Sequence, residues 1–412
     1  MTRTAQTQAS AHLLAPKEVG TSIELFTGGG GLALAMHAAG FRHLLAVEWE
    51  KRAGATLLRN VANEFSPGEP DPNSIEDQWP LIQGDVRVVD FTRWQGVVDA
   101  VAGGVPCQPW SLGGVHKGYD DPRNLWPELF RCVRETRPRA VIAENVKGLL
   151  RPSFKPYYDY ILRELVAPFE RRVEGEDWRD HDKRLEKALR HPPGDPTERY
   201  SVKFQLVNAA DYGVPQTRWR VFVIAFRADL ERDDWDFPAV THSETALRRS
   251  QESGMYWERH GILPRRVATP GLFEAEDGLS PWRTLRDAIA GLPPPAEDQE
   301  HQRWLHHRWW PGARAYPGHT PNDLDRPAKT VKAGVHGVPG GETVVRLDDG
   351  SIRYLTVREV ARVMTFPDDW WLAGPRGEQM RQLGNAVPPM LGQVIAASVA
   401  SAMRPRLKET SQ

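Results

Sequence analysis

Short apolar runs alternate with helical patterns over the first part of the chain. Strands are expected at residues 22–26, 44–48, 99–103 and 140–144 and just before Gln83, and helices at 32–39, 51–63, 128–137 and 156–166. This alternation predicts an α/β fold with a doubly wound, mostly parallel sheet of Rossmann-like type. Ligands of such sheets bind beyond the carboxyl ends of the strands. Those ends carry Gly28, Glu48, Asp85, Cys107 and Glu144.

The pattern changes twice further along the chain. Residues 170–199 are strongly charged and indicate an exposed helical insertion, after which strands are expected at 204–208 and 220–226. Beyond residue 227 the chain becomes rich in Pro, Trp and Arg, and order returns with a hairpin signal at Asp348-Asp349-Gly350 and helices at 357–364 and 388–403. We therefore expect a disordered lead-in (1–18), a catalytic domain (19–227 plus 376–404) and a smaller, irregular target-recognition lobe (228–375) with a closing motif at 353–367.

Composition narrows the class of protein. Of the 412 residues, 40% are hydrophobic and 26% are charged, as in soluble globular proteins. Two cysteines exclude a disulfide scaffold, and the 13 histidines show no metal-ligand spacing with them, so no metal is expected. No apolar run is long enough to span a membrane, and the low cysteine count suits a reducing cytoplasm. The net charge of −1 argues neither for nor against nucleic acid.

A glycine-rich turn and two acidic residues indicate a nucleotide-like ligand. Phe26-Thr-Gly-Gly-Gly-Gly31 lies between a strand and a helix, where glycines let the backbone approach a ligand. Glu48 is placed to hold ribose hydroxyls, Trp49 offers a stacking face for adenine, and Asp85 could accept from an adenine amino group. Because the turn lacks a phosphate-loop motif, an adenosine-containing cofactor is expected rather than ATP hydrolysis.

Three further groups carry candidate chemistry. Cys107 lies in a loop beyond a strand and is a candidate nucleophile, although most cysteines are small buried hydrophobes. Glu144, at the end of the next strand, is expected to have a raised pKa, although a strand-end carboxylate can simply pair with an arginine. Arg218 and Arg220 are spaced to reach into the site from one side, or else form surface salt bridges.

Together these pieces resemble the DNA (cytosine-5) methyltransferase family over residues 20–227 and 326–403. The matching motifs, in family order, are Glu24-Leu-Phe-Thr-Gly-Gly-Gly-Gly31, Glu48-Trp49, Gly84-Asp85, Pro106-Cys107-Gln108 with Ser111, Glu144-Asn145-Val146, Gln216-x-Arg218-x-Arg220, Arg358-Glu359-x-Ala361-Arg362 with Phe366-Pro367, and Gly384-Asn385-x-Val387. The chain departs from the family in its unusually glycine-rich cofactor turn, in Pro109-Trp110 after the nucleophile and in the 170–199 insertion. In residues 228–325 we find no segment that matches a family motif.

The resemblance implies transfer of a methyl group from S-adenosylmethionine, which becomes S-adenosylhomocysteine, to C5 of a flipped cytosine in double-stranded DNA. The expected catalytic residues are Cys107, Glu144, Arg218 and Arg220. The expected cofactor-binding residues are Phe26, Gly28, Gly30, Gly31, Glu48, Trp49, Asp85, Val86, Pro106, Leu125, Asn385 and Val387. The expected substrate-binding residues are Gln108, Ser111, Asn145 and Gln216.

The resemblance leaves alternatives open. A tRNA cytosine-5 methyltransferase has the same fold and chemistry, although an irregular lobe of this size favours DNA readout. A non-catalytic DNA-binding module is the third interpretation. Within the lobe, Arg265-Arg266 and Trp304 to Arg308 are candidate DNA contacts, with packing and solvated charge as the competing explanation. We expect a monomer on DNA, near the nucleoid, that belongs to a restriction-modification or other phage-defence system.

Overall fold

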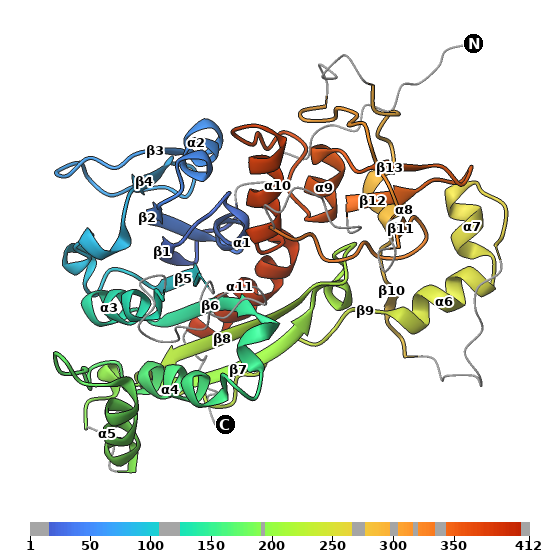
Figure 1. The fold of residues 1–412 in the computed structure, drawn as a ribbon. Coiled ribbons are helices and arrows are strands. Elements are labelled where there is room, and N and C mark those ends of the chain that lie inside the picture. Colours follow the sequence, from blue (N-terminus) through green and yellow to red (C-terminus); the bar gives the residue numbers. More distant parts are fainter. Residues whose placement is uncertain are drawn as a thin grey trace, which may run out of the picture.

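The computed structural model describes most of the chain. The residues that it describes are 16–106, 124–190, 194–265, 277–296, 304–315, 320–333 and 343–404. Figure 1 shows a central sheet flanked by helices, with a smaller lobe beside it.

The central sheet has eight strands in the order β3-β4-β2-β1-β5-β6-β8-β7. Their bounds are β1 Gly20–Leu25, β2 Phe41–Glu48, β3 Ala62–Glu64, β4 Trp79–Gln83, β5 Ala100–Gly104, β6 Ala140–Val146, β7 Tyr200–Asn208 and β8 Trp219–Arg227. All neighbours pair in parallel except β8, which is antiparallel to both β6 and β7. The predicted mostly parallel α/β sheet is therefore confirmed. The three-residue strand β3 was not predicted, because so short a segment has no readable period.

Both faces of the sheet are covered by helices, as the continuous apolar strands require. On β6, Val141 and Ala143 belong to one core while Ala140 and Ile142 belong to the other, as the two-residue period of a strand dictates. The first core is closed by α3 Trp126–Thr136 and α4 Lys155–Val166, and the second by α1 Gly31–Ala38 and α11 Pro389–Met403. The site must therefore open at an edge of the sheet rather than on a face.

A third core joins the sheet to the lobe. It contains Leu57 from α2 (Lys51–Asn60), Trp370, and Val360 from α9 (Val357–Val363). In Figure 1, α9 and α10 (Arg376–Asn385) stand between the sheet and the lobe. The two parts of the molecule thus share apolar packing, which makes their relative placement part of the fold.

The lobe contains more regular structure than its sequence indicated. Its further elements are α6 Glu244–Glu252, α7 Met255–His260, α8 Leu285–Ile289, β9 His242–Ser243, β10 Ser280–Pro281, β11 Asn322–Asp323, β12 Val344–Arg346 and β13 Ile352–Tyr354. The antiparallel pairing of β12 with β13 confirms the predicted hairpin, whose Gly350 has a φ of 84°. Within the described part of the lobe, the helices α6, α7 and α8 were not predicted from the sequence. The capping box of Thr284 and Asp287 was the local signal for α8.

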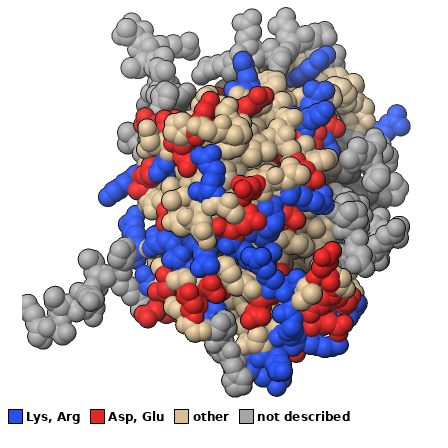
Figure 2. Space-filling model, turned by 90° about the vertical axis from the view of Figure 1, so that its left-hand side faces the viewer, with Lys and Arg blue, Asp and Glu red and all other residues tan. Residues whose placement is uncertain are grey.

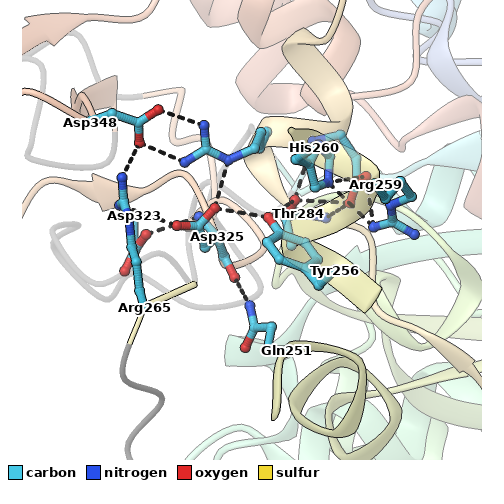
Figure 3. Close-up of polar contacts among 11 residues, drawn as sticks. Gln251, Tyr256, Arg259, His260, Arg265, Thr284, Asp323, Asp325 and Asp348 are labelled. Atoms are coloured by element: carbon cyan, nitrogen blue, oxygen red, sulfur yellow. Dashed lines mark hydrogen bonds and ion pairs between the residues drawn. The ribbon is translucent and has the colours of Figure 1, made fainter. Parts of the chain in front are cut away.

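An ionic network centred on the buried Asp325 holds these lobe elements together (Figure 3). Arg286 on α8 pairs with Asp325, which follows β11, and with Asp348 in the hairpin turn. Tyr256 lies on α7, and its hydroxyl donates to the Asp325 carboxylate. Arg265, which is partly exposed, forms ion pairs with both Asp325 and Asp348. Four segments distant in sequence are thereby fixed in one arrangement.

The charged insertion forms one amphipathic helix, α5 (Trp178–Arg190), at the lower left of Figure 1. Trp178 and Leu185 are buried in the core beside α4. His181 Nδ1 and the Tyr160 hydroxyl are hydrogen-bonded at 3.0 Å. Its opposite side carries solvated charges such as Lys183. The helix therefore packs on the catalytic part of the molecule through one face.

Among the described residues, the helical stretch Arg376–Met403 is long enough and apolar enough to cross a membrane, judged by length and hydropathy alone. It consists of α10 and α11, and the apolar side chains of α11 lie in the core against α1 and the sheet. Its hydropathy therefore reflects core packing.

Charges of both signs lie on the face shown in Figure 2. Basic side chains run in a band across the middle of the view, with acidic side chains on both sides. This view is taken from the left of Figure 1, where α3 and α5 lie. On α3, Arg131 pairs with Glu128 and Glu135, and on α5, Lys183 pairs with Asp180. Most of the positive charge on these helices is therefore neutralised locally.

Candidate active site

The glycine turn follows β1 at the carboxyl edge of the sheet. Phe26 has a φ of 56°, Gly28 of 58° and Gly30 of 96°, so the chain reverses through three left-handed residues. A side chain on Gly31 would overlap the Val387 carbonyl, because an added Cβ would lie 2.3 Å from that oxygen. Apart from Gly28 and its two chain neighbours, no atom of the described residues lies within 4 Å of where a Cβ on Gly28 would be. The turn thus has one open side, which a ligand could approach closely.

Glu48 closes the end of β2 beside this turn. One carboxylate oxygen accepts from the Gly28 amide at 2.6 Å, and the other accepts from the Glu50 amide at 2.6 Å. Burial raises the pKa of Glu48, while these amide hydrogen bonds oppose the rise. Because each carboxylate oxygen has a second lone pair, Glu48 keeps acceptor capacity for ligand hydroxyls. The indole of Trp49 is 70% exposed next to it.

Two further expected cofactor residues follow β4. Asp85 accepts from the Arg87 amide at 3.0 Å and pairs with the Arg87 guanidinium, so part of its acceptor capacity is already used. Val86, the next residue, is buried. The structure therefore places an acidic acceptor at the third strand end in the row after Gly28 and Glu48, as the sequence predicted.

The last expected cofactor motif connects α10 to α11. Asn385 is exposed, and Val387 is buried with its carbonyl against Gly31. This segment and the glycine turn, more than 350 residues apart in the sequence, are thus in direct contact.

The expected nucleophile lies outside the described residues, together with Gln108 and Ser111. The structure describes the chain up to Pro106, which is half-buried at the end of β5, and resumes at Asn124. Leu125 is half-buried and packs on the core at the start of α3. The sheet therefore positions the chain up to Pro106, the residue before Cys107. The position of the Cys107 thiol itself stays a prediction.

Glu144 forms the centre of the described site. Its carboxyl is buried, and Arg220 Nε lies 2.7 Å from Glu144 Oε1. The other oxygen, Oε2, lies beside Gly104, at 3.4 Å from where a Cβ would be. Burial raises the pKa of Glu144 even though the charges of Arg220 and Arg218 act against it. The raised pKa agrees with the expected proton-donating role, and the arginine pair, which the sequence offered as the alternative, is present as well.

Asn145 links this strand to the chain that leads into the nucleophile loop. Its Nδ2 donates to the Val105 carbonyl at 3.1 Å, and its Oδ1 accepts from the Val146 amide at 2.8 Å. Both groups are buried. The side chain therefore holds the end of β5, two residues before Cys107, against the end of β6.

Arg218 differs from the expectation that it reaches into the site alongside Arg220. It is fully buried, and its guanidinium donates to the carbonyls of Val331 at 2.8 Å, Gly384 at 2.7 Å and Ala386 at 2.9 Å. Its donors thus fasten the segment of the last cofactor motif to the start of β8. The i, i+2 spacing could not show this, because Arg218 precedes the strand and its partners are distant in sequence.

Gln216 also differs from its expected role at the substrate. It is fully buried, and its Oε1 accepts from the Val331 amide at 3.0 Å while its Nε2 lies 3.0 Å from the Met364 sulfur. Its polar groups are therefore committed to contacts between the two parts of the molecule.

The candidate DNA contacts in the lobe are largely occupied by internal partners. Arg265 pairs with Asp325 and Asp348, the guanidinium of Arg362 lies 4.9 Å from the Trp304 ring centroid, and His307 is fully buried. Arg266 lies outside the described residues. Packing, the competing explanation, therefore fits these positions better.

Two features of the site were not singled out from the sequence. Trp370, three residues after the Phe366-Pro367 pair, donates from its indole Nε1 to the Gly29 carbonyl at 3.1 Å. The exposed Lys147 lies over the ring of Trp219, 5.3 Å from its centroid. The only sequence signal for both was their position next to recognised motifs.

Comparison with known proteins identifies the family of the chain. The model of the C-5 cytosine-specific DNA methylase family matches residues 20–167 and 196–401. The chain belongs to this family. The match includes residues 228–325, which were expected to match nothing, so that expectation was wrong. The match leaves out residues 168–195, which contain α5.

Similar proteins cover nearly the whole chain. The type II methyltransferase M.NgoMIV of Neisseria gonorrhoeae is 30% identical over 93% of this chain and 98% of the relative. The type II methyltransferase M.PspPI of Psychrobacter sp. (strain TA137) is 30% identical over 92% of this chain and 78% of the relative. The solved methyltransferase EhMeth of Entamoeba histolytica shares the fold with a TM-score of 0.53 and 13% identity, over 94% of this chain and 100% of that one.

Family membership confirms the expected reaction class. The protein is a DNA (cytosine-5) methyltransferase, and the alternatives of an RNA-directed enzyme and a non-catalytic module are not supported by the family or by the named relatives.

Proposed function

We propose that the chain methylates C5 of a flipped cytosine in double-stranded DNA with Cys107 as nucleophile and Glu144 as proton donor. The observation that supports this most is the buried Glu144 carboxyl, which lies beside Gly104 and is paired with Arg220. A carboxyl whose pKa is raised by burial is suited to donate a proton near neutral pH. Gly104 is three residues before Cys107, so the thiol and the carboxyl are expected to face one pyrimidine.

The residues around the glycine turn fit S-adenosylmethionine. The open space beside Gly28 admits a ligand close to the backbone, Glu48 has lone pairs left for ribose hydroxyls, and the exposed Trp49 offers an aromatic face for adenine. The further expected contacts are Phe26, Gly30, Gly31, Asp85, Val86, Pro106, Leu125, Asn385 and Val387. When bound there, the sulfonium supplies an electrophilic methyl group.

The side chains of this protein would activate the cytosine. The Cys107 thiolate adds to C6, which makes C5 nucleophilic, and Glu144 donates a proton to N3 to ease that addition. Arg220 supports the charge that develops at O2. C5 would then take the methyl group, and loss of the C5 proton to a base would expel Cys107 and give the methylated cytosine. Because C6 is inaccessible in a stacked duplex, the base must leave the helix, at a cost of roughly a few kcal/mol.

The other expected residues divide into two groups. Gln108 and Ser111, next to the nucleophile, are proposed substrate contacts. Arg218, Gln216 and Asn145 are proposed as positioning residues, because their polar groups bind main chain or neighbouring side chains within the protein. The catalytic group is thereby reduced to Cys107, Glu144 and Arg220.

We place one strip of the DNA interface at Lys147 and Trp219. Val146 pairs with Arg220 across β6 and β8, so Lys147 and Trp219 are the next residues outward from the Glu144–Arg220 pair. An exposed cation over an exposed indole matches what a nucleic-acid backbone and an unstacked base require. The duplex would therefore lie over this end of the two strands.

The remaining assignments complete the proposal. The catalytic domain would comprise residues 19–227 and 376–404, and the target-recognition lobe residues 228–375. The relatives are type II methyltransferases by name, which supports a role in a restriction-modification system. We propose that the protein acts without a metal, as a monomer on DNA, in the cytoplasm near the nucleoid.

A methyl-transfer assay with labelled S-adenosylmethionine tests the proposal. Duplex DNA should accept label at C5 of cytosine, and tRNA should not. Cys107→Ala should abolish transfer while S-adenosylhomocysteine still binds, and Glu144→Gln should lose most activity without unfolding. Full activity of Cys107→Ala, or label in tRNA alone, would contradict the mechanism or the substrate.

The DNA interface has its own test. Lys147→Ala and Trp219→Ala should each weaken DNA binding roughly five- to tenfold, since one stacked base or phosphate contact contributes about 1 kcal/mol or more. Lys183→Ala, on the solvated side of α5, is the matched control and should bind DNA as the unmodified protein does. Equal affinity of all three variants would move the duplex elsewhere.

A further inference from the structure

The cofactor turn has little means of fixing its own shape. Four consecutive glycines, Gly28 to Gly31, carry no side chains, and glycine has more backbone freedom to lose than any other residue. Two of them also adopt left-handed conformations, with φ of 58° at Gly28 and 96° at Gly30. The conformation that a ligand meets must therefore be imposed by neighbouring residues.

Trp370 supplies two of these constraints. Its indole Nε1 donates to the Gly29 carbonyl at 3.1 Å, which sets the plane of the peptide between Gly29 and Gly30. The indole ring also fills the space beside Gly30, where an added Cβ would lie 2.9 Å from a ring carbon. Trp370 is 4% exposed. A hydrogen bond and a steric contact thus act on one peptide from a buried side chain.

Trp370 is itself held firmly from the other side. Arg358 is fully buried, and its guanidinium donates to the carbonyls of Trp370 at 2.8 Å and Pro367 at 2.7 Å. The Nε of the same arginine donates to the Leu305 carbonyl at 2.9 Å, in the lobe. The tryptophan is therefore a fixed part of the structure, and the turn adapts to it rather than the reverse.

We propose that Trp370 is a positioning residue for the methyl donor, holding the four-glycine turn in its ligand-ready conformation. This inference rests on the proposed function, in which the turn receives S-adenosylmethionine. The space beside Gly30 is filled by Trp370, whereas the space beside Gly28 is open to a ligand. Without the indole N–H, the turn would sample other conformations, and binding would have to select the competent one.

Trp370→Phe isolates the hydrogen bond, because phenylalanine keeps an aromatic ring beside Gly30 and lacks the donor. The matched control is Trp371→Phe, since the neighbouring Trp371 bonds Asn60 through its main-chain amide and carbonyl. Loss of one buried N–H···O bond predicts a roughly five- to tenfold higher Kd for S-adenosylmethionine and for S-adenosylhomocysteine in Trp370→Phe. The control should stay within twofold.

Two further measurements separate positioning from general damage. Hydrogen exchange of the peptide covering residues 27–31 should be faster in Trp370→Phe with no ligand present, while exchange in β6 is unchanged. The KM for S-adenosylmethionine should rise with kcat within twofold, and DNA affinity without the donor should be unaltered. A purely structural role would instead change DNA affinity and exchange throughout the protein.

The outcomes distinguish this inference from the proposed function. If the unmodified protein binds neither S-adenosylmethionine nor S-adenosylhomocysteine, the proposed function fails. If it binds them and Trp370→Phe binds equally well with unchanged exchange at residues 27–31, only the role of Trp370 is overturned.

Discussion

Glu164→Gln should remove one defined contribution to the pH dependence of stability. Glu164 lies on α4, is 5% exposed, and faces Arg134, whose Nη1 is 3.7 Å from Glu164 Oε1. Burial raises the pKa of this carboxyl from 4.5 to about 7, although the hydrogen bond with Tyr160 and the charge of Arg134 oppose the rise. The folded protein therefore binds a proton more tightly than the unfolded chain does.

The sign and size of the effect follow from this difference. Between pH 4.5 and pH 7 the folded state holds a proton at Glu164 that the unfolded state has released, so stability falls as the pH rises. The pKa difference corresponds to about 3 kcal/mol, fully present below pH 4.5 and lost above pH 7. Glutamine resembles the protonated carboxyl and does not titrate. The variant should therefore gain stability, relative to the unmodified protein, as the pH rises.

Urea unfolding followed by circular dichroism at pH 5 and pH 8 measures this gain. The difference in unfolding free energy between Glu164→Gln and the unmodified protein should change by about 2 to 3 kcal/mol between these pH values. Other titrating groups contribute equally to both proteins and cancel in this difference. Glu186→Gln, at an exposed position on α5, is the control and should show no such change. An unchanged difference between pH 5 and pH 8 for Glu164→Gln would refute the assignment of a raised pKa to this buried carboxyl.

Three other substitutions test the site. Arg218→Met leaves three buried carbonyls without their hydrogen-bond donor. The melting temperature should therefore drop by an amount equivalent to about 3 kcal/mol or more of unfolding free energy. An unchanged melting temperature would contradict the positioning role. Asn145→Ala should lower kcat several-fold, with the Kd for S-adenosylmethionine unchanged by isothermal titration, because it frees the chain that leads to Cys107. Glu48→Gln would place the donor N–H₂ group of the glutamine against the donor amide of Gly28 or Glu50. The Kd for S-adenosylmethionine, from the same titration, should therefore be about tenfold higher. An unchanged Kd would exclude Glu48 from the cofactor site.

The sequence by itself determined the sheet and the strand ends at which the site is proposed. Two-residue and helical periods along one strand or helix are local signals, so β1, β2, β5, β6 and β8 were predictable from the order of apolar and polar residues. The motifs at the strand ends then indicated Glu48 and Glu144, because all carboxyl ends of parallel strands meet at one edge.

Tertiary structure alone decided the partners of the buried polar groups. Arg218 was expected at the pyrimidine, yet its guanidinium binds carbonyls 113 to 168 residues away, and Trp370 donates to Gly29 across 341 residues. No spacing along the chain encodes such contacts. They depend on which donors and acceptors the packed sheet and lobe leave buried together, and a buried polar group must find a partner wherever the fold brings one.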